Sequence, residues 1–443
     1  MIASLKHVFK LVIASLLEWE ARLVLAKYKP RVIAVTGSVG KTSAKDAIYA
    51  VLQSSYFVRR SEKSFNSEVG IPLTILGCPN AWSNPFLWVQ NLLDGLALIL
   101  FRNEYPKWLV LEIGADRPGD IRKLSRWIPS DIVVVTRLPE VPVHVEYFES
   151  PEALFKEKSY AVRQAKQKAV TILNADDARV MAFSAEARGE ILTFGLTEGA
   201  TVSASHIKAL YRSENGRTFP EGMTFRVDHG GRSVPISLYG ILGTQSVYAA
   251  LAGITVGVSC GVNLVEAGQA LAKMTTAPGR MRLIEGLKGT LLIDDTYNAS
   301  PVAEEEALAA LSSILPPQTG EGVGRKIAVL GDMLELGRYS ADEHKQAGKR
   351  AAEICNFLIT VGFRARYIAE GALAAGMHES KILQFEDAEE AGEALELMLE
   401  QGDVVLVKGS QSMRMEKTVE AVMAHPEDKE KLLVRQEKEW VGR

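Results

Sequence analysis

A short glycine-containing loop between a strand and a helix constrains this chain more than any other feature. The apolar run 32–35 predicts a strand, and a helical pattern extends from Lys41 to about Leu52. Backbone N–H groups of such a loop point at a bound phosphate, a lysine adds positive charge, and a threonine hydroxyl can bind Mg²⁺. The segment therefore predicts a site for the phosphates of ATP, formed by Thr36, Gly37, Ser38, Val39, Gly40, Lys41, Thr42 and Ser43.

The spacing of this loop differs from the common phosphate-binding pattern. That pattern is G-x-x-x-x-G-K-[ST], and Val35 stands at its first glycine position. The chain instead carries the shorter form Thr-Gly-x-x-Gly-Lys-Thr, which reduces the number of nucleotide-binding families to which it could belong. A glycine turn that binds no phosphate is the alternative, but the strand before the loop and the helix after it favour phosphate binding.

Composition sets broad limits on what the protein does. A chain of 443 residues is long enough for two or three domains, each with its own core. The net charge of −3 gives no electrostatic footprint for nucleic acid. Cys78, Cys260 and Cys355 are far apart and suggest neither a zinc site nor a disulfide framework. We expect a cytoplasmic monomer that does not bind nucleic acid.

Two segments are unusually apolar, residues 5–28 and residues 84–101. Charged residues interrupt the first too often for a membrane-spanning helix, and no small-residue cleavage site follows it as in a signal peptide. Two interpretations remain for this pair of helices. They pack on the protein, or they form a surface that makes peripheral contact with a membrane or a lipid-linked substrate.

Apolar runs alternate with helical segments after the phosphate loop, at 108–112, 131–136 and 169–174. Such alternation predicts an α/β fold, here a central P-loop ATPase domain with a mostly parallel sheet. Residues 201–239 change to short polar–apolar alternations with turns near 214–216 and 229–231, which predicts an antiparallel appendage on the same domain.

A second α/β pattern begins after a hinge at 277–280 and predicts a C-terminal Rossmann-like domain. Its strands are expected at 290–294, 326–330, 357–361 and 403–408. Residues 316–324 are expected to form a flexible loop, and the charge-dense tail 427–443 a solvated helix. The predicted organisation is an N-terminal helix (1–30), a central domain (31–278) and a C-terminal domain (279–443).

Three residues beyond the loop are candidates for the site at the strand ends. Glu112 ends a buried strand, and ligands bind at the carboxyl ends of strands in open α/β sheets. It is placed either to share Mg²⁺ with Thr42 or to cap a nearby element. His144 follows the next strand, and Lys158 comes fourteen residues later in a helical stretch. Taken singly, the histidine and the lysine are weak signals.

The order of these residues resembles the Mur ligase family, the ATP-dependent ligases that build the peptidoglycan stem peptide. Within the family, the closest likeness is to the branch that adds D-alanyl-D-alanine to a muramoyl-tripeptide. The motifs that carry the resemblance are Thr36–Thr42, Asn66–Leu73, Leu111–Ala115, His144–Ser150, Gly279–Met281, Asp294–Pro301, Val329–Gly337 with His344, and Val407–Ser410.

The resemblance implies an ADP-forming ligase that joins a small-molecule carboxylate acceptor to the amine of an amino acid or dipeptide through an acyl phosphate. It implies two Mg²⁺ ions beside ATP and a carbamylated Lys158, rather than Lys156, as an anionic metal ligand. Lys41 would offset charge on the transferring phosphoryl group. By this resemblance, Thr42 and Glu112 would hold the first metal, and Glu112, His144 and Lys158 would surround the second. Asp295, Asn298 and Arg280 would contact the nucleotide. Asn66, Lys408 and Ser410 would contact the substrates. A solvated loop lysine is the alternative for Lys408.

Two departures from the family pattern leave the substrate and the adenine site open. Family members that act on muramoyl-peptides carry a UDP-binding domain ahead of the loop, whereas one helix of about thirty residues is expected there in this chain. The family's Gly-x-His-Asn-x-x-Asn helix start reads Gly243–Ala249 here, without either asparagine. The alternatives are therefore a ligase for a lipid-linked or other acceptor, and a non-catalytic nucleotide-dependent interaction protein.

Overall fold

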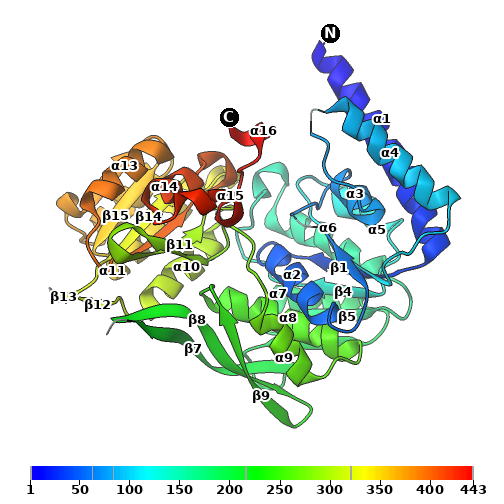
Figure 1. Cartoon of the computed structure of the whole chain (residues 1–443), viewed down its shortest axis with the longest axis horizontal. Coiled ribbons are helices and arrows are strands. Elements are labelled where there is room, and N and C mark those ends of the chain that lie inside the picture. Colours follow the sequence, from blue (N-terminus) through cyan, green and yellow to red (C-terminus); the bar gives the residue numbers. More distant parts are fainter. Residues whose placement is uncertain (1, 62, 83, 215–216, 320–321, 442–443) are drawn as a thin grey trace.

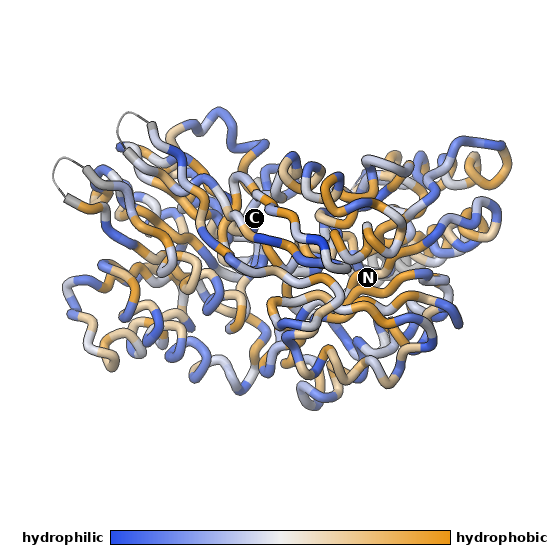
Figure 2. Tube along the Cα trace, turned by 90° about the horizontal axis from the view of Figure 1, so that it is seen from below, coloured by the Kyte–Doolittle hydropathy of each residue, from blue (hydrophilic) through white to orange (hydrophobic). Residues whose placement is uncertain are grey.

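The computed structural model describes residues 2–61, 63–82, 84–214, 217–319 and 322–441, which form two lobes (Figure 1). The first lobe is built on a nine-stranded sheet and the second on a six-stranded sheet. Both sheets are mostly parallel and covered by helices, so the predicted fold class is confirmed. Figure 2 shows hydrophobic positions concentrated along the strands inside both lobes.

The first lobe has its strands in the order β2-β3-β1-β4-β5-β6-β7-β8-β9, and only the last three are paired antiparallel. Its strands are β1 (Arg31–Thr36), β2 (Val58–Arg60), β3 (Trp108–Glu112), β4 (Ile132–Val135), β5 (Val170–Asn174), β6 (Ile191–Gly195), β7 (Val202–Glu214), β8 (Arg217–His229) and β9 (Arg232–Tyr239). Its helices are α1 (Ile2–Tyr28), α2 (Lys41–Leu52), α3 (Gly70–Leu76), α4 (Pro85–Leu100), α5 (Asp120–Ser125), α6 (Pro151–Arg163), α7 (Ala178–Met181), α8 (Thr244–Ser259) and α9 (Leu264–Ala272).

Alternate residues of β1 pack on opposite sides of the first sheet. Val32 and Ala34 join a core with α1, α3 and α6, whereas Ile33 and Val35 join a core with α2 and α8. All four side chains are fully buried, and each larger one contributes about 1.5–3 kcal/mol. The strand before the phosphate loop is therefore held on both faces, which gives the loop a rigid base.

The second lobe has the strand order β10-β11-β17-β14-β15-β16, with only β10 antiparallel to its neighbour. Its strands are β10 (Arg282–Gly286), β11 (Thr290–Asp295), β14 (Lys326–Gly331), β15 (Phe357–Val361), β16 (Ile382–Phe385) and β17 (Val404–Lys408). Its helices are α10 (Pro301–Ser313), α11 (Ser340–Ile354), α12 (Arg366–Ala374), α13 (Ala388–Met398), α14 (Glu416–Val422), α15 (Lys429–Leu432) and α16 (Lys438–Val441).

The antiparallel appendage predicted at 201–239 is β7–β9, which extend the first sheet beneath the second lobe (Figure 1). Part of the turn predicted at 214–216 lies outside the described residues. The two lobes touch there, since the Tyr211 hydroxyl accepts a hydrogen bond from the backbone N–H of Leu315 at 3.0 Å.

Two predictions about irregular segments were wrong. Residues 316–324 contain the paired strands β12 (Gln318–Thr319) and β13 (Gly322–Val323) instead of only a loop. The tail was predicted as one solvated helix over 427–443, but its described part, 427–441, is broken between α15 and α16. Arg435 in this break is only 8% exposed and forms a 2.7 Å ion pair with Glu416. A buried ion pair and hydrogen bonds to two backbone carbonyls hold the tail in place, which charge density alone does not reveal.

Helices α1 and α4 lie side by side and run in the same direction at one edge of the first lobe (Figure 1). Their C-terminal ends are joined, because Lys27 Nζ donates hydrogen bonds to the carbonyls of Leu98 and Ile99 at 2.8 and 3.0 Å. Among the described residues, no helix has the length and apolar character needed to cross a membrane.

Candidate active site

The phosphate loop lies at the carboxyl end of β1, between β3 and β4. Gly37 and Gly40 both have positive φ angles, of 135° and 81°. A Cβ on Gly37 would lie 2.1 Å from Thr136 Oγ1, so the end of β4 leaves room only for glycine. The Thr136 hydroxyl donates to the carbonyl of Val39 at 2.7 Å, and Ser38 N–H donates to the carbonyl of Arg137 at 2.7 Å. Neighbouring strand β4 therefore fixes the loop's shape.

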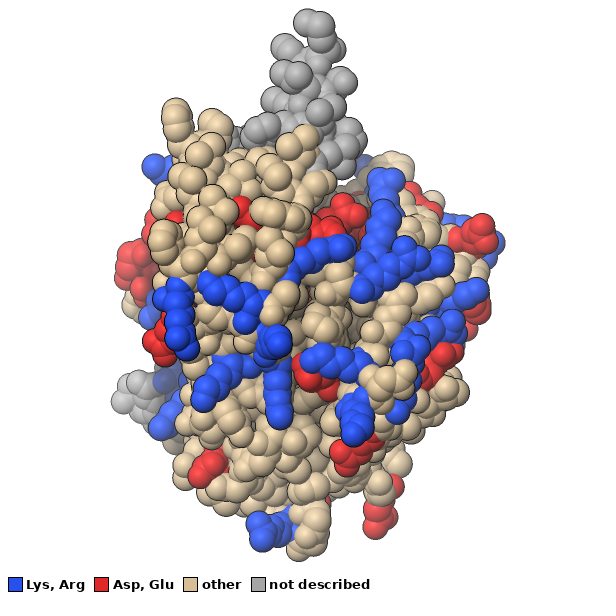
Figure 3. All heavy atoms as spheres, turned by 90° about the vertical axis from the view of Figure 1, so that its right-hand side faces the viewer, with Lys and Arg blue, Asp and Glu red and all other residues tan. Residues whose placement is uncertain are grey.

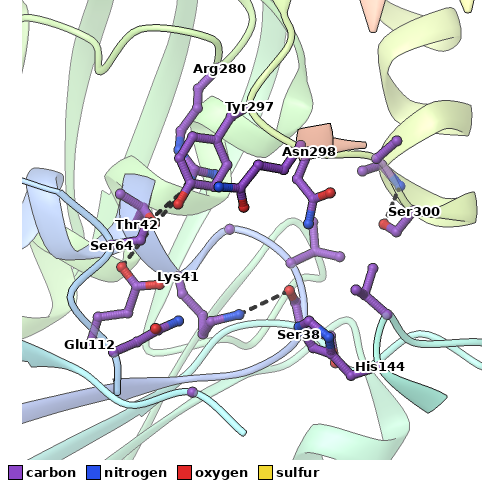
Figure 4. Close-up of a pocket in the computed structure, with 18 of the residues that line it drawn as sticks. Ser38, Lys41, Thr42, Ser64, Glu112, His144, Arg280, Tyr297, Asn298 and Ser300 are labelled. Atoms are coloured by element: carbon purple, nitrogen blue, oxygen red, sulfur yellow. Dashed lines mark hydrogen bonds between the residues drawn. The ribbon is translucent and has the colours of Figure 1, made fainter. Parts of the chain in front are cut away.

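Thr42 is at the centre of a hydrogen-bonded group that joins the two lobes (Figure 4). Its hydroxyl donates to Glu112 Oε2 at 2.8 Å and lies 2.7 Å from the hydroxyl of Ser64. Arg280, at the start of the second lobe, donates a hydrogen bond from Nη2 to Thr42 Oγ1 at 2.9 Å. Its Cζ atom lies 4.0 Å from the centre of the Tyr297 ring. A hydroxyl and a carboxylate oxygen side by side form the kind of oxygen pair that Mg²⁺ binds.

Two lysines lie below this group, Lys158 buried and Lys41 half-buried, and neither donates a hydrogen bond to a carboxylate. Lys41 Nζ donates to the carbonyl of Ser38 at 3.2 Å, and Lys158 Nζ donates to the carbonyl of Gly37 at 2.9 Å. Burial lowers the pKa of Lys41, and nearby Glu112 opposes that effect. Burial lowers the pKa of Lys158 far more, and the charge of Lys41 adds to it. The site therefore disfavours a second ammonium at Lys158.

His144 lies between carboxylates of both lobes. Its Nδ1 is 2.5 Å from Glu335 Oε2, and its Nε2 is 3.6 Å from Asp116 Oδ1. Glu335 belongs to the loop after β14, and the backbone N–H of Glu146 donates to its carbonyl at 3.4 Å. The loop that carries His144 is therefore closed against the second lobe.

The second lobe contributes a charged pair at the ends of two adjacent strands. Lys408 Nζ forms a 2.6 Å ion pair with Asp295 Oδ2 and donates to the carbonyl of Asn298 at 2.9 Å. Lys408 is 1% exposed, so the solvated-loop alternative for it was wrong. Ser410 is also buried, and its hydroxyl accepts a hydrogen bond from Leu334 N–H at 2.8 Å.

These groups surround one cavity of about 420 Å³ between the lobes. Figure 4 shows Arg280, Tyr297 and Asn298 entering it from the side opposite to Lys41 and Glu112. Most of the residues predicted from the sequence line the cavity, namely Ser38, Val39, Gly40, Lys41, Thr42, Asn66, Glu112, His144, Lys158, Arg280, Asp295, Asn298 and Lys408. Four others, Thr36, Gly37, Ser43 and Ser410, lie within two positions of these residues in the chain but outside the cavity lining.

The cavity fits a nucleotide phosphate with Mg²⁺. Helix α2 begins at the cavity with Gly40 as its N-cap, and no side chain caps this helix start, so its first N–H groups are left for an anion. The hydroxyl of Ser38 is buried beside them without a hydrogen-bond partner. Within the described residues, no three His, Cys, Asp or Glu side chains converge into a metal site. The Thr42 hydroxyl and the single carboxylate of Glu112 fit Mg²⁺, which is held by one or two carboxylates together with substrate phosphates.

Several residues of the cavity were not predicted from the sequence. Ser64, Asp116, Tyr297 and Glu335 all line it. Tyr297 and Glu335 lie inside two of the motifs that carry the family resemblance, but nothing in those motifs shows which side chains face the nucleotide. Ser64 lies in the loop after β2, and its sequence context carries no signal.

His344, which accompanies the motif that contains Glu335, is a structural residue here. It is fully buried, its Nε2 accepts a hydrogen bond from Met333 N–H at 2.9 Å, and its Nδ1 lies 2.6 Å from the carbonyl of Ser340. These contacts tie α11 to the loop that carries Glu335. His344 therefore supports the cavity wall without reaching the cavity.

A phosphate loop on one α/β lobe, closed by an arginine from a second Rossmann-like lobe, defines a two-lobed nucleotide-dependent α/β enzyme. The Mur ligase middle-domain model matches residues 90–257, and the Mur ligase glutamate ligase domain model matches residues 279–411. The chain belongs to the Mur ligase family, as the sequence motifs predicted.

Known relatives agree with this assignment. The UDP-N-acetylmuramoyl-tripeptide–D-alanyl-D-alanine ligase of Bacillus subtilis is 29% identical over 408 residues, which cover 92% of this chain and 79% of the relative. The enzyme of the same name from Mycobacterium leprae is 29% identical over 397 residues, covering 86% and 71%. The crystal structure of the MurF ligase of Thermotoga maritima in complex with ADP superposes with a TM-score of 0.72 at 26% identity, covering 92% of this chain and 83% of that one.

Proposed function

We propose that this protein is an ATP-dependent, ADP-forming ligase that adds D-alanyl-D-alanine or a similar amine to the carboxylate of a muramoyl-peptide in cell-wall synthesis. The observation that carries the proposal is the meeting of Lys41, Thr42 and Glu112 with Arg280 around one cavity between two lobes. The names of the relatives from Bacillus subtilis and Mycobacterium leprae support the choice of substrates.

The proposed reaction has two steps. An oxygen of the acceptor carboxylate attacks the γ-phosphorus of ATP, the bond from that phosphorus to the β–γ bridging oxygen breaks, and ADP leaves. The amine nitrogen then attacks the acyl carbon, phosphate leaves, and the nitrogen loses a proton. Lys41 and Arg280 would stabilise the charge that spreads over the phosphoryl oxygens, because phosphoryl transfer depends mainly on positioning and electrostatics.

We assign the metal ligands to residues that line the cavity. Thr42 and Glu112 would hold one Mg²⁺, and Glu112, His144 and Lys158 would surround a second. When bound, the ions would neutralise phosphate charge and orient the reacting groups. Lys158 suits this role only as a carbamate, since an ammonium repels a cation. Its burial beside Lys41 favours the neutral amine, the form that combines with CO₂.

The adenine ring would lie at a small pocket beside the phosphate loop, and this pocket has to widen to admit it. That pocket is lined by Asn174, Gln245 and Tyr248 of the first lobe, and an ion pair between Arg137 and Glu306 of α10 closes it. Gln245 and Tyr248 lie at the helix start where the family's asparagines are missing. An amide and an aromatic ring can supply the hydrogen bond and the flat contact that a purine needs.

Two further assignments complete the proposal. Asn66 would meet the acceptor, because it lines both the catalytic cavity and a neighbouring cavity of about 410 Å³. Lys408 would act by holding Asp295 and the backbone of Asn298, with Ser410 supporting it from outside the cavity. We divide the chain into an N-terminal helix (1–30), a central domain (31–278) and a C-terminal domain (279–443), working as a monomer in the cytoplasm.

A screen of phosphate release tests the function. The purified chain is mixed with ATP, Mg²⁺, a UDP-muramoyl-tripeptide and one amine at a time, with D-alanyl-D-alanine among them. We expect ADP release that needs both the acceptor and the amine, and a product whose mass equals their sum less one water. Failure to release ADP with any acceptor–amine pair would contradict the proposal and favour a nucleotide-dependent interaction protein.

A lipid-linked acceptor is the second candidate, with the same chemistry. The favouring observation is that Ala14 of the apolar helix α1 lines the neighbouring cavity together with Asn66, which also lines the catalytic cavity. The same screen, repeated with a lipid-linked muramoyl-peptide in detergent, distinguishes the two. A higher kcat/KM for the lipid-linked acceptor than for the UDP-linked one would show that the lipid-linked peptide is the preferred substrate.

A further inference from the structure

Helices α1 and α4 carry an unusual share of the exposed apolar surface. Ten of the twenty large hydrophobic side chains that are exposed among the described residues belong to these helices or to the residue after α4. They are Val12, Leu16, Trp19, Leu23, Phe86, Val89, Leu93, Leu96, Leu100 and Phe101. Single exposed apolar residues are common, but a contiguous group of this size marks an interaction surface.

The exposed residues of α4 lie along one face of the helix. Positions 86, 89, 93, 96 and 100 recur every three or four residues, the spacing of a single helical stripe. Their exposed fractions run from 37% at Leu96 to 84% at Phe86. The opposite face contains the buried residues Asn91 and Gly95 and packs toward α1 and α3. The apolar stripe of α4 therefore takes no part in packing this helix against the rest of the protein.

Five exposed cations surround the C-terminal ends of the two helices. They are Lys27, Lys29, Arg31, Arg102 and Lys107, with Glu104 as the acidic residue among them. Hydrogen bonds hold the two segments together, since Asn103 N–H donates to the Tyr28 hydroxyl at 3.3 Å and Arg31 N–H to the Lys107 carbonyl at 2.9 Å. We call this group the basic collar. Figure 3 shows lysines and arginines in a row below an uncharged surface on this side of the molecule.

We propose that the α4 stripe and the basic collar together bind the surface of an anionic lipid bilayer. An apolar helix face that lies in the headgroup region, beside cations that meet lipid phosphates, is the arrangement of a peripheral membrane protein. Charge complementarity favours an anionic bilayer over a second copy of this chain, whose matching helix faces are apolar with exposed cations at their ends. The bilayer matches both features at once.

This surface deepens the proposed function and rests on it, because docking would place the acceptor site at the membrane. The cavity lined by Ala14, Asn66 and Asp116 lies against α1 and shares Asn66 and Asp116 with the catalytic cavity. An acceptor carried by the bilayer would reach Asn66 past α1.

Vesicle flotation of the full chain tests the proposal. The probes are vesicles of phosphatidylcholine with phosphatidylglycerol, vesicles of phosphatidylcholine alone, and the first kind again in high salt. We expect the chain to float with the anionic vesicles and to lose most of that binding in high salt. In Val89→Glu/Leu93→Glu the bound fraction should fall by about tenfold or more, because two charges enter the stripe. Lys29→Glu/Arg102→Glu should weaken binding to anionic vesicles only.

The matched control is Phe363→Glu/Leu397→Glu, which places the same charges on exposed apolar residues of the second lobe, 72% and 86% exposed. It should float like the unmodified chain. Absence of flotation with every vesicle, or equal flotation of the stripe variant and the control, overturns the proposal. So does light scattering that shows a dimer abolished by the stripe variant, without vesicle binding. Phosphate release with soluble substrates reports separately on the ligase, so the failure of one proposal does not hide the other.

Discussion

Arg280 donates a hydrogen bond from Nη2 to the hydroxyl of Thr42 at 2.9 Å, across 238 positions of sequence. Thr42 opens the helix after the phosphate loop, and Arg280 precedes the first strand of the second lobe. The contact joins Thr42, a proposed metal ligand in the first lobe, to the guanidinium of Arg280 at the start of the second lobe. Closure of the lobes and assembly of the site are therefore one event.

Replacing Arg280 with lysine should lower kcat by about a hundredfold, because the change removes preorganised donors from the phosphoryl group. Lysine also loses the stacking on Tyr297 that holds the guanidinium in place. Phosphate release measures kcat, and calorimetry with ADP measures nucleotide affinity. Arg282→Lys is the matched control, because the Arg282 guanidinium donates to the carbonyl of Lys431 outside the cavity. Equal losses in both variants would refute the role of Arg280.

Lys158→Ala should abolish turnover, and a small carboxylate such as formate should restore part of it by replacing the carbamate oxygens. Lys156→Ala, two residues earlier on the exposed side of α6, should keep full activity. Phosphate release gives the rates, and ¹³C NMR after equilibration with labelled bicarbonate should show a carbamate signal that the Lys158 variant lacks. Full activity in Lys158→Ala would refute the metal-ligand assignment.

The two loop glycines should respond differently to alanine. A Cβ on Gly37 would lie 2.1 Å from Thr136 Oγ1, whereas a Cβ on Gly40 meets nothing within 4 Å. Both substitutions carry the strain of a positive φ, about 1–2 kcal/mol. Gly37→Ala should therefore weaken ADP binding at least tenfold more than Gly40→Ala, as measured by calorimetry. Equal affinities would show that β4 does not hold the loop in the bound state.

Glu304→Gln should stabilise the protein at high pH. Glu304 is 1% exposed, neither of its carboxylate oxygens has a hydrogen-bond partner, and burial raises its pKa from 4.5 to about 7. The folded state therefore holds a proton that the unfolded state releases, so stability is complete below about pH 4.5 and is lost as the pH rises through about 7. The neutral glutamine avoids this loss.

The expected gain in the free energy of unfolding is roughly 1–3 kcal/mol near pH 8, and it should shrink toward pH 5. Urea unfolding at the two pH values measures it. Glu305→Gln is the control, since this neighbour is exposed and paired with Arg350. A gain that does not change with pH would contradict protonation of Glu304.

Much of the fold was predictable because its strands are continuous apolar runs between turn residues. β1, β3, β5 and α2 begin and end within about one residue of their predicted bounds. The meeting of Thr42 with Glu112 was also foreseeable, because parallel strands β1 and β3 are neighbours and end at the same edge. The buried course of the tail was not foreseeable, because it depends on Arg435 reaching Glu416.

The amino-acid sequence by itself determined the phosphate loop, the alternation of strands and helices, and the family motifs. These features are local: a glycine conformation, an apolar period or a fixed spacing is written in a few consecutive residues. Only the tertiary structure decided that Arg280 reaches Thr42, that Glu335 faces His144, and that Lys158 is buried beside Lys41. Such contacts join residues that are far apart along the chain, and they exist because two separately packed lobes bring their strand ends to one cavity.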